Sequence, residues 1–263
     1  MRNLDLAKRI IIKVGTSSIT HKNGNLNFKQ IDGLARIISD LTNSGKQVAL
    51  VSSGAITAGV SRLNLAERPK DVALKQAVAC VGQNALMEIY NKFFATYGYT
   101  VGQLLLSKYI FDHSVFSENA RESLFKLWGM GVIPIINEND SISADEIKLG
   151  DNDNLSGYVA RLIDADLLIM LSDIDGVYDK NPKQFNDAKI IPHLRKDDEI
   201  LSQILSNQEA GAFGPGGIGT KIKAGLLCAE SGVNAVIANS ADLKVIYDIL
   251  DNKIVGTFFP HKK

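Results

Sequence analysis

Apolar residues along this chain follow two alternating patterns, short continuous runs and sets spaced for one face of a helix. The runs are rich in Val, Ile and Leu and predict buried strands at residues 10–14, 48–51, 101–106, 132–136, 167–171 and 233–237. Helical spacing predicts helices at residues 31–41, 55–63, 73–94, 119–127, 155–162, 221–231 and 244–250, and residues 255–259 predict a last strand. Because strands alternate with helices, we expect an α/β fold, with a mostly parallel sheet between two layers of helices.

Small polar residues directly follow four of the predicted strands. These loops read KVGTSS from Lys13, VSSGA from Val51, NENDS from Asn137 and SDIDG from Ser172. Ligands of parallel α/β sheets bind outside the carboxyl ends of the strands, so we expect the four loops to build one pocket. The SSGA stretch has two interpretations: it caps the next helix, or it receives a carboxylate or phosphoryl group of a ligand.

Two dense clusters of Asn and Asp stand at residues 137–140 and 151–154. A calcium loop that began at Asp151 would need a ligand and a glycine where Leu155 and Ser156 stand, which excludes the EF-hand. An ordinary solvated turn predicts scattered polar residues instead of two clusters. Because Asn and Asp offer both hydrogen-bond donors and acceptors, the clusters suit a zwitterion better than a metal alone.

Two lysines predict a site for anions. Lys13 interrupts an apolar strand, where an unpaired buried charge would cost several kcal/mol, so it either points along an edge into water or reaches a bound anion. Lys221 closes the glycine-rich stretch GPGGIGTK, residues 214–221, at the start of a predicted helix, where phosphate binds well. The alternative is a plain flexible loop capped by Thr220. The stretch also matches G-x-G-x-x-G, but no strand precedes it, which argues against a dehydrogenase.

Composition narrows the classes of function. The chain of 263 residues is 45% apolar and has 29 basic and 29 acidic residues, so we expect a full core and no nucleic-acid or membrane partner. No apolar run is long enough for a signal peptide or a membrane span, and a cytoplasmic protein is expected. Cys80 and Cys228 lie in apolar, helix-like surroundings and are expected to be buried free thiols. The four histidines are dispersed, without the spacing of a metal site or a catalytic triad.

Taken in order, KVG, SSGAITAG, INEND, GDNDNLS, SDIDGVY and GGIGTK resemble the amino-acid kinase family, from about residue 8 to residue 259. Together these motifs are very specific, whereas any one alone would be weak. The chain is most similar to the members that use ATP to phosphorylate the γ-carboxylate of L-glutamate to L-glutamyl 5-phosphate, the first step of proline biosynthesis. The resemblance implies the amino-acid kinase fold in a single domain of residues 1–263, where residues 1–160 bind mainly the amino acid and residues 161–263 mainly the nucleotide.

The resemblance also implies roles for individual residues. Lys13, Lys221 and Asp153 should be catalytic: the lysines contact the phosphates of ATP, and Asp153 organises the lysines or the Mg²⁺ environment. The substrate glutamate should be bound by Ser53, Gly54, Asn137, Asp140 and Asn152. ATP should be bound by Lys13, Ser172, Asp173, Pro215, Gly216, Gly217, Ile218, Gly219, Thr220 and Lys221. Mg²⁺ should be held mainly by the ATP phosphates, without a metal site of the protein's own. Pro215 and Ser172 stand where relatives often have Thr.

Partners and alternatives follow from the same resemblance. It implies a homo-oligomer, feedback inhibition by proline and a functional hand-off to glutamyl-phosphate reductase. Many bacterial members carry an extra C-terminal domain, which this chain is expected to lack. The irregular residues 178–213 are the candidate lid that keeps water from the labile acyl phosphate. The alternatives are a sibling kinase for N-acetylglutamate, aspartate, carbamate or UMP, and a non-catalytic amino-acid sensor, against which the presence of both lysines and Asp153 argues.

Overall fold

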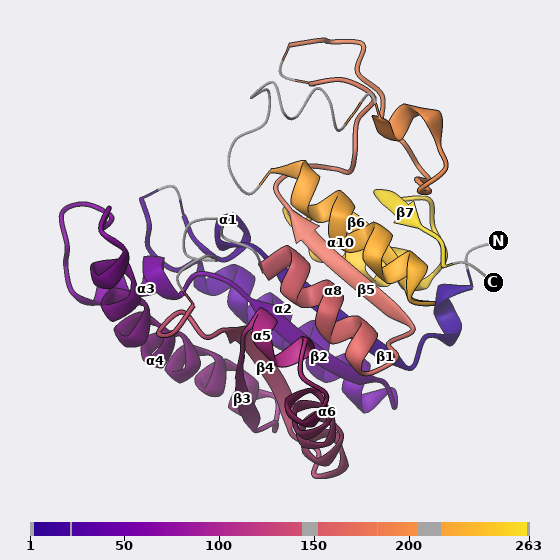
Figure 1. The fold of residues 1–263 in the computed structure, drawn as a ribbon. Helices are drawn as coiled ribbons and strands as arrows, with labels where there is room; N and C mark the ends of the chain where they lie inside the picture. Colours follow the sequence, from indigo (N-terminus) through magenta and orange to yellow (C-terminus); the bar gives the residue numbers. More distant parts are fainter. Residues whose placement is uncertain are drawn as a thin grey trace.

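A sheet of seven strands forms the centre of the molecule (Figure 1). The computed structural model describes residues 3–21, 23–143, 152–182, 184–202, 204 and 217–261. The strands are β1 (Arg9–Val14), β2 (Gln47–Ser52), β3 (Val101–Leu106), β4 (Ile133–Glu138), β5 (Leu167–Ser172), β6 (Asn234–Asn239) and β7 (Thr257–Phe259). They lie in the order β3-β4-β2-β1-β5-β6-β7, and every neighbouring pair is parallel except β6 and β7. The expected mostly parallel sheet is therefore confirmed.

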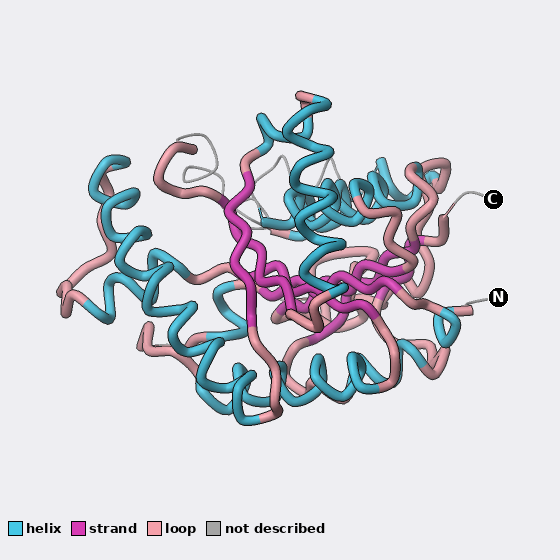
Figure 2. The backbone as a smooth tube through the Cα atoms, turned by 90° about the horizontal axis from the view of Figure 1, so that it is seen from below, coloured by secondary structure: helices cyan, strands magenta, loops and turns pink. Residues whose placement is uncertain are grey.

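Helices cover both faces of this sheet, as Figure 2 shows. The helices of the described residues are η1 (Leu4–Leu6), α1 (Thr16–Ile19), α2 (Phe28–Asn43), α3 (Ala55–Arg62), α4 (Val72–Thr96), α5 (Lys108–Phe111), α6 (Ser114–Gly129), α8 (Asn152–Leu162), α10 (Ile218–Glu230) and α11 (Val245–Leu250). Residues of α2, α4 and α11 form one buried apolar cluster on the sheet, and residues of α6, α8 and α10 form the other. The three-layer α/β/α architecture is confirmed.

The central strand β1 shows how the sequence assigns side chains to the two layers. Ile10 and Ile12 pack in the cluster with α2 and α4, whereas Ile11 packs in the cluster with α8 and α10. Successive side chains of a strand point to opposite faces, so Lys13 lies on the same face as Ile11. The strand therefore directs its lysine toward α8 and α10.

Helices α3 and α4 approach each other closely through glycine. A Cβ atom on Gly82 of α4 would overlap the carbonyl oxygen of Ala55, and one on Gly59 of α3 would overlap that of Val78. Only a residue without a side chain allows two helix backbones to come so near. The contact fixes the start of α3, and hence the end of β2, against the middle of α4.

The structure departs from the sequence interpretation in a few places. Helices α1 and α5 have four residues each, too few for a periodic pattern to be recognised. Cys228 is buried as expected, but the expectation for Cys80 is wrong, because its side chain is exposed on α4. Apolar residues lie on both sides of this helix, including the exposed Leu74 and Val81, so sequence alone did not reveal its buried face.

Two further expectations concern the middle of the chain and the membrane. An antiparallel bridge joins Tyr178 to Ile190, so the first part of the irregular stretch forms a hairpin-like turn. Residues 205–213 at the other end of the candidate lid lie outside the described residues. Among the residues that are described, no helix has the length and apolar character needed to span a membrane.

Candidate active site

The carboxyl ends of the parallel strands meet at one edge of the sheet and bring the predicted loops together. Val14 at the end of β1 lies beside Ser52 of β2, and Ser172 of β5 lies beside Asn239 of β6. Glu138 ends β4, the next strand beyond β2. The loops after these strands therefore face a common space, where parallel α/β proteins bind their ligands.

Three charged side chains from separate elements meet at this edge. The carboxylate of Asp153, in the first turn of α8, accepts a hydrogen bond from the Nζ of Lys13 on one oxygen, Oδ1. Its other oxygen, Oδ2, accepts from the Nζ of Lys221 at 3.1 Å and from the Oγ1 of Thr220 at 2.6 Å. Lys13 and Asp153 are only 4% and 2% exposed. The three residues predicted to be catalytic thus form one ion-pair cluster, buried at Lys13 and Asp153 and partly buried at Lys221, which we call the Lys-Asp-Lys cluster.

The charge balance of the Lys-Asp-Lys cluster favours an anionic ligand. Burial raises the pKa of Asp153, but the charges of Lys13 and Lys221 and the hydrogen bonds from Lys13 and Thr220 outweigh it, and the net pKa is lowered. Asp153 is therefore ionised at neutral pH and holds both ammonium groups by ion pairs. Two of the three members of the cluster are cationic, and ammonium groups attract phosphates and carboxylates.

Asn152, the first residue of α8, connects this helix to the end of β2. Its Nδ2 group donates to the backbone oxygen of Ser52 at 3.0 Å, to the Oγ of Ser53 at 3.0 Å and to the Oδ1 of Asn137 at 2.8 Å. Three of the residues predicted to bind the amino acid, Ser53, Asn137 and Asn152, are thus directly joined. Among the described residues, the Oδ1 atom of Asn152 is buried without a hydrogen-bond partner.

The bonds of Asn137 extend this group into α4. Its Oδ1 also accepts from the backbone N–H of Glu138 at 2.9 Å, and its Nδ2 donates to the Oε1 of Gln83 at 2.7 Å. Asp140 follows in the turn after β4 and, with Gln83, lines a pocket of about 260 Å³. The fourth predicted substrate residue therefore lies at the same strand end, beside the partner of Asn137.

Gly54 has the backbone conformation that the turn after β2 requires. It precedes α3 with a φ angle of 102°, in the left-handed region that favours glycine. The preceding residues are tied down from both sides: the Ser53 N–H donates to the Val14 oxygen at 3.2 Å, and the Oγ of Ser52 lies 2.7 Å from the hydroxyl of Tyr90. The SSGA loop is thus fixed to β1 and to α4.

The predicted nucleotide residues lie at the other side of β1. Ser172 is 4% exposed at the end of β5, and its Oγ donates to the Oδ1 of Asp173 at 3.3 Å. Gly217 precedes α10, so that Ile218, Gly219, Thr220 and Lys221 form the first turn of this helix. Pro215 and Gly216 lie outside the described residues. The free N–H groups of a helix N-terminus favour phosphate at this point.

Sequence reasoning missed two buried polar residues of α4 that support the site, Gln83 and Tyr90. Both lie in a long run that reads as an apolar helix, and Gln83 is 9% exposed. A buried glutamine within such a run was the available signal, since polar side chains are rarely buried without a specific hydrogen bond.

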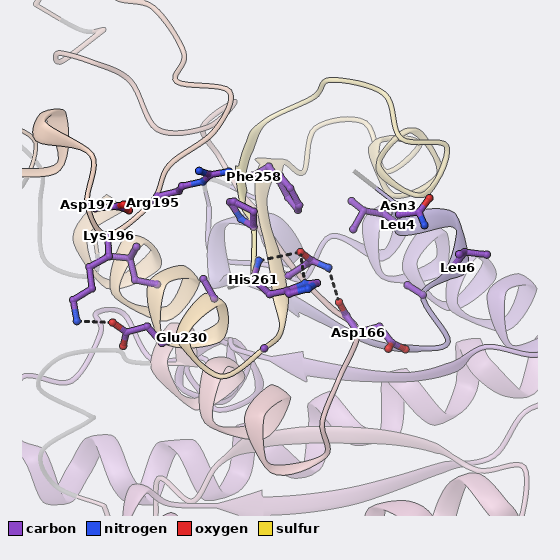
Figure 3. Close-up of a pocket in the computed structure, with 16 residues that line it drawn as sticks. Asn3, Leu4, Leu6, Asp166, Arg195, Lys196, Asp197, Glu230, Phe258 and His261 are labelled. Carbon is purple, nitrogen blue, oxygen red and sulfur yellow. Dashed lines mark hydrogen bonds and ion pairs between the residues drawn. The ribbon is translucent and has the colours of Figure 1, made fainter. Parts of the chain in front are cut away.

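The larger of the two described cavities lies elsewhere. Its volume is about 1040 Å³, and its lining includes Asp166 just before β5 and Asn234 at the start of β6, so it lies at the amino ends of these strands. Figure 3 shows an ion pair at its rim, between Lys196 and Glu230 at 2.5 Å. Its lining contains neither lysine of the Lys-Asp-Lys cluster. A search for the site by cavity volume alone would therefore point to the amino ends of the strands, away from the Lys-Asp-Lys cluster.

No protein metal site accompanies the cluster in the described part of the chain. No group of three or more His, Cys, Asp or Glu side chains that could hold a metal ion occurs there. Both oxygens of Asp153 are already taken by lysine and threonine donors.

Comparison with known proteins connects this site to a family. The amino acid kinase family model matches residues 8–239 of the chain. The chain is 44% identical to the glutamate 5-kinase of Clostridium perfringens, over 98% of this chain and 97% of that protein. It is 43% identical to the glutamate 5-kinase of Lactococcus lactis, over 99% and 98%. It is 47% identical to that of Caldanaerobacter subterraneus, over 95% of this chain and 67% of the longer relative.

Solved structures with little sequence similarity share the fold. The carbamate kinase from Giardia lamblia bound to AMP-PNP superimposes with a TM-score of 0.66 at 14% identity, covering 98% of this chain and all 100% of that one. The UMP kinase from Ureaplasma parvum gives a TM-score of 0.63 at 17% identity, covering 97% and 99%. At such identities the likeness extends to the fold alone.

Proposed function

The chain belongs to the amino acid kinase family, and from this premise we propose that the Lys-Asp-Lys cluster transfers the γ-phosphoryl group of ATP to L-glutamate. The reaction is ATP-dependent phosphorylation of the γ-carboxylate, which gives L-glutamyl 5-phosphate for proline biosynthesis. The main support for this proposal is the sequence identity of 43–47% to glutamate 5-kinases over nearly the whole chain. The carbamate and UMP kinases, at 14% and 17%, offer no comparable support for another acceptor.

The chemistry needs no general base. The γ-carboxylate of glutamate, with an ordinary pKa of about 4.3, is already ionised at neutral pH. One of its oxygens attacks the γ-phosphorus of ATP, the bond from that phosphorus to the bridging oxygen breaks, and ADP leaves with the electron pair. Catalysis then consists of alignment and charge neutralisation. This agrees with a site that contains two lysines and no histidine.

Each member of the Lys-Asp-Lys cluster has a distinct part in this step. Lys13 and Lys221 draw together two anions that otherwise repel each other, and they stabilise the charge on the phosphoryl oxygens in the transition state. Asp153 holds both ammonium groups, because each of its oxygens accepts from one of them. It acts as the residue that orients the two lysines. Mg²⁺ would enter with ATP on the phosphate oxygens and would add further positive charge there.

The joined polar groups after β2 and β4 suit the amino-acid end of glutamate. Ser53, Asn137 and Asn152 supply hydroxyl and amide groups, Gly54 allows close approach, and Asp140 supplies a carboxylate for the ammonium group. On the other side of β1, Ser172 and Asp173 together with residues 215–221 would hold the nucleotide. We propose accordingly that residues 1–160 of the single domain bind mainly the amino acid and residues 161–263 mainly the nucleotide.

A hydroxamate assay tests the function. The protein is incubated with ATP, Mg²⁺, hydroxylamine and one acid at a time: L-glutamate, N-acetylglutamate, aspartate or carbamate. We expect the hydroxamate to form with L-glutamate, and little hydroxamate to form with the other acids. UMP is tested separately, and ADP release in its presence should stay close to the background. A preference for another acid would identify a sibling kinase. Binding of glutamate without ADP release from ATP would identify a sensor.

Regulation and assembly complete the proposal. We propose that the protein is cytoplasmic and homo-oligomeric, that proline inhibits it by feedback, and that its labile product passes to glutamyl-phosphate reductase. The stretch of residues 178–213 is proposed as the lid that excludes water from the acyl phosphate. Titration of proline into the same assay measures the inhibition directly, and sedimentation measures the oligomer.

A further inference from the structure

We propose that Gln83 is a positioning residue of the amino-acid site, which sets the orientation of Asn137 and, through it, of Asn152. Gln83 lies in the middle of α4, and its Oε1 accepts the Nδ2 hydrogen bond of Asn137 at 2.7 Å. The inference rests on the proposed function, which assigns Asn137 and Asn152 to glutamate binding. It adds a residue whose part is to hold Asn137 in place.

Backbone groups at both ends determine which way the two amides point. The N–H of Glu138 can only donate, so the atom of Asn137 that it contacts at 2.9 Å must be the oxygen. The carbonyl of Ser52 can only accept, so the atom of Asn152 that it contacts at 3.0 Å must be the nitrogen. The nitrogen of Asn137 must then face Gln83, which presents an oxygen to it.

This arrangement leaves one acceptor for a ligand. The nitrogen of Asn152 is used by Ser52, Ser53 and Asn137, while its Oδ1 is buried without a partner among the described residues. A buried acceptor without a hydrogen bond is costly, and an N–H donor of the bound amino acid would satisfy it. The α-ammonium of glutamate is the donor that the substrate offers. Gln83 therefore acts by keeping this oxygen turned toward the substrate.

The position of Gln83 is rigid because of its neighbour in sequence. Gly82 packs so closely on Ala55 of α3 that no side chain fits between the helices. The same contact fixes the loop that carries Ser53 and Gly54, since this loop leads directly into α3. The close approach of α3 and α4 thus places Gln83 and the SSGA loop as one unit.

Two variants of Gln83 separate the positioning role from a general loss of structure. Gln83→Met keeps the length of the side chain but removes the acceptor, and Gln83→Glu keeps an acceptor oxygen in either protonation state. Asn91→Met is the matched control, because Asn91 is exposed on the same helix. We expect Gln83→Met to raise the glutamate KM about tenfold, as lost ground-state binding should, with kcat and the ATP KM within about twofold of wild type. Because Gln83→Glu keeps the acceptor oxygen, its glutamate KM should stay close to that of wild type.

Side-chain amide resonances provide a readout that does not depend on activity. In ¹⁵N spectra of the ligand-free protein, the NH₂ signals of Asn137 should shift in Gln83→Met but stay nearly in place in Gln83→Glu and Asn91→Met. An unchanged glutamate KM in Gln83→Met, or equal increases of both KM values, would overturn the inference. If wild type makes no hydroxamate from glutamate while the amide signals shift as described, the proposed function fails and the positioning of Asn137 stands.

Discussion

At the scale of single residues, Asp153 joins the two lysines of the Lys-Asp-Lys cluster. A lysine in a buried strand is costly unless its charge is paired, and Asp153 supplies that pairing for Lys13 while it also holds Lys221. The sequence left two possibilities for Lys13, an edge position in water or contact with a bound anion, and the structure instead pairs its ammonium group with the carboxylate of Asp153. In the proposed mechanism Lys13 also contacts the phosphates of the bound ATP.

Loss of Lys221 should impair the chemical step itself. Lys221→Ala removes one of the two ammonium groups that, in the proposed mechanism, stabilise the charge of the transferring phosphoryl group, and we expect kcat to fall by at least about 10²-fold. Lys223→Ala, an exposed lysine on the same helix, is the control and should leave kcat nearly unchanged. Steady-state kinetics with glutamate and ATP measure both. Near-normal turnover of purified Lys221→Ala would remove Lys221 from catalysis.

Asp153 should also make stability depend on pH in the acid range. Its pKa is lowered from the ordinary 3.8, so folding gains stability from the carboxylate that is fully present above 3.8 and is lost as the pH falls through the lower native value. Asp153→Asn removes this dependence, and it should cost about 3–5 kcal/mol at pH 7 because both lysines lose their carboxylate.

Urea unfolding between pH 5 and pH 3 measures the difference. Below about pH 4, the unfolding free energy of wild type should decline with pH more steeply than that of Asp153→Asn, by up to about 1.4 kcal/mol per pH unit for one proton. Parallel declines in the two proteins would show that Asp153 titrates with the same pKa in the folded and unfolded chains.

At the scale of helices and strands, periodic patterns in the sequence predicted where the elements lie. The sequence did not predict which side of a helix is buried when contacts with other elements determine it. The continuous apolar run around Ile11 is enough by itself to indicate a buried strand, and the bounds of β1 were predicted almost to the residue. Helix α4 is apolar on both sides, so the exposure of Cys80 and the burial of Gln83 depend on which side meets α3 and the sheet. Packing between elements determines which side of α4 is buried, and the local sequence pattern does not show it.

The glycine contact between α3 and α4 offers a test at this scale. Gly82→Ala places a methyl group against the Ala55 carbonyl, and we expect a loss of at least about 2 kcal/mol in unfolding free energy together with a higher glutamate KM. Gly129→Ala is the matched control, because a Cβ there meets no atom within 4 Å at the end of α6, and it should be neutral or stabilising by up to about 1 kcal/mol. Equal stability of the two variants would contradict the close packing.

At the scale of the whole molecule, β1 lies between the two proposed substrate sites. The amino-acid residues follow β2 and β4 on one side of it, and the nucleotide residues follow β5 and precede α10 on the other. The order of these motifs along the chain indicated this division. The sequence predicted that the loops meet, because parallel strands end at the same edge of the sheet. The hydrogen bonds among Ser53, Asn137 and Asn152 became visible only in the structure.

Substitutions on the two sides of β1 should therefore affect different Michaelis constants. Asp140→Ala should raise the KM for glutamate about tenfold or more and leave the KM for ATP nearly unchanged, as loss of substrate binding at one site does. Asp173→Ala should do the reverse. Initial rates with one substrate varied at saturating levels of the other measure both. A normal glutamate KM in Asp140→Ala would exclude Asp140 from the amino-acid site.

The wide spacing of the Lys-Asp-Lys cluster along the chain has a consequence for protein synthesis. Lys13 and Asp153 are 140 residues apart, and Lys221 follows Asp153 by another 68. A growing polypeptide therefore contains its first lysine long before the partner carboxylate is translated, and it can complete both ion pairs only after Lys221 has been added. A polypeptide that stops before Lys221 therefore lacks one of the two ion pairs of Asp153.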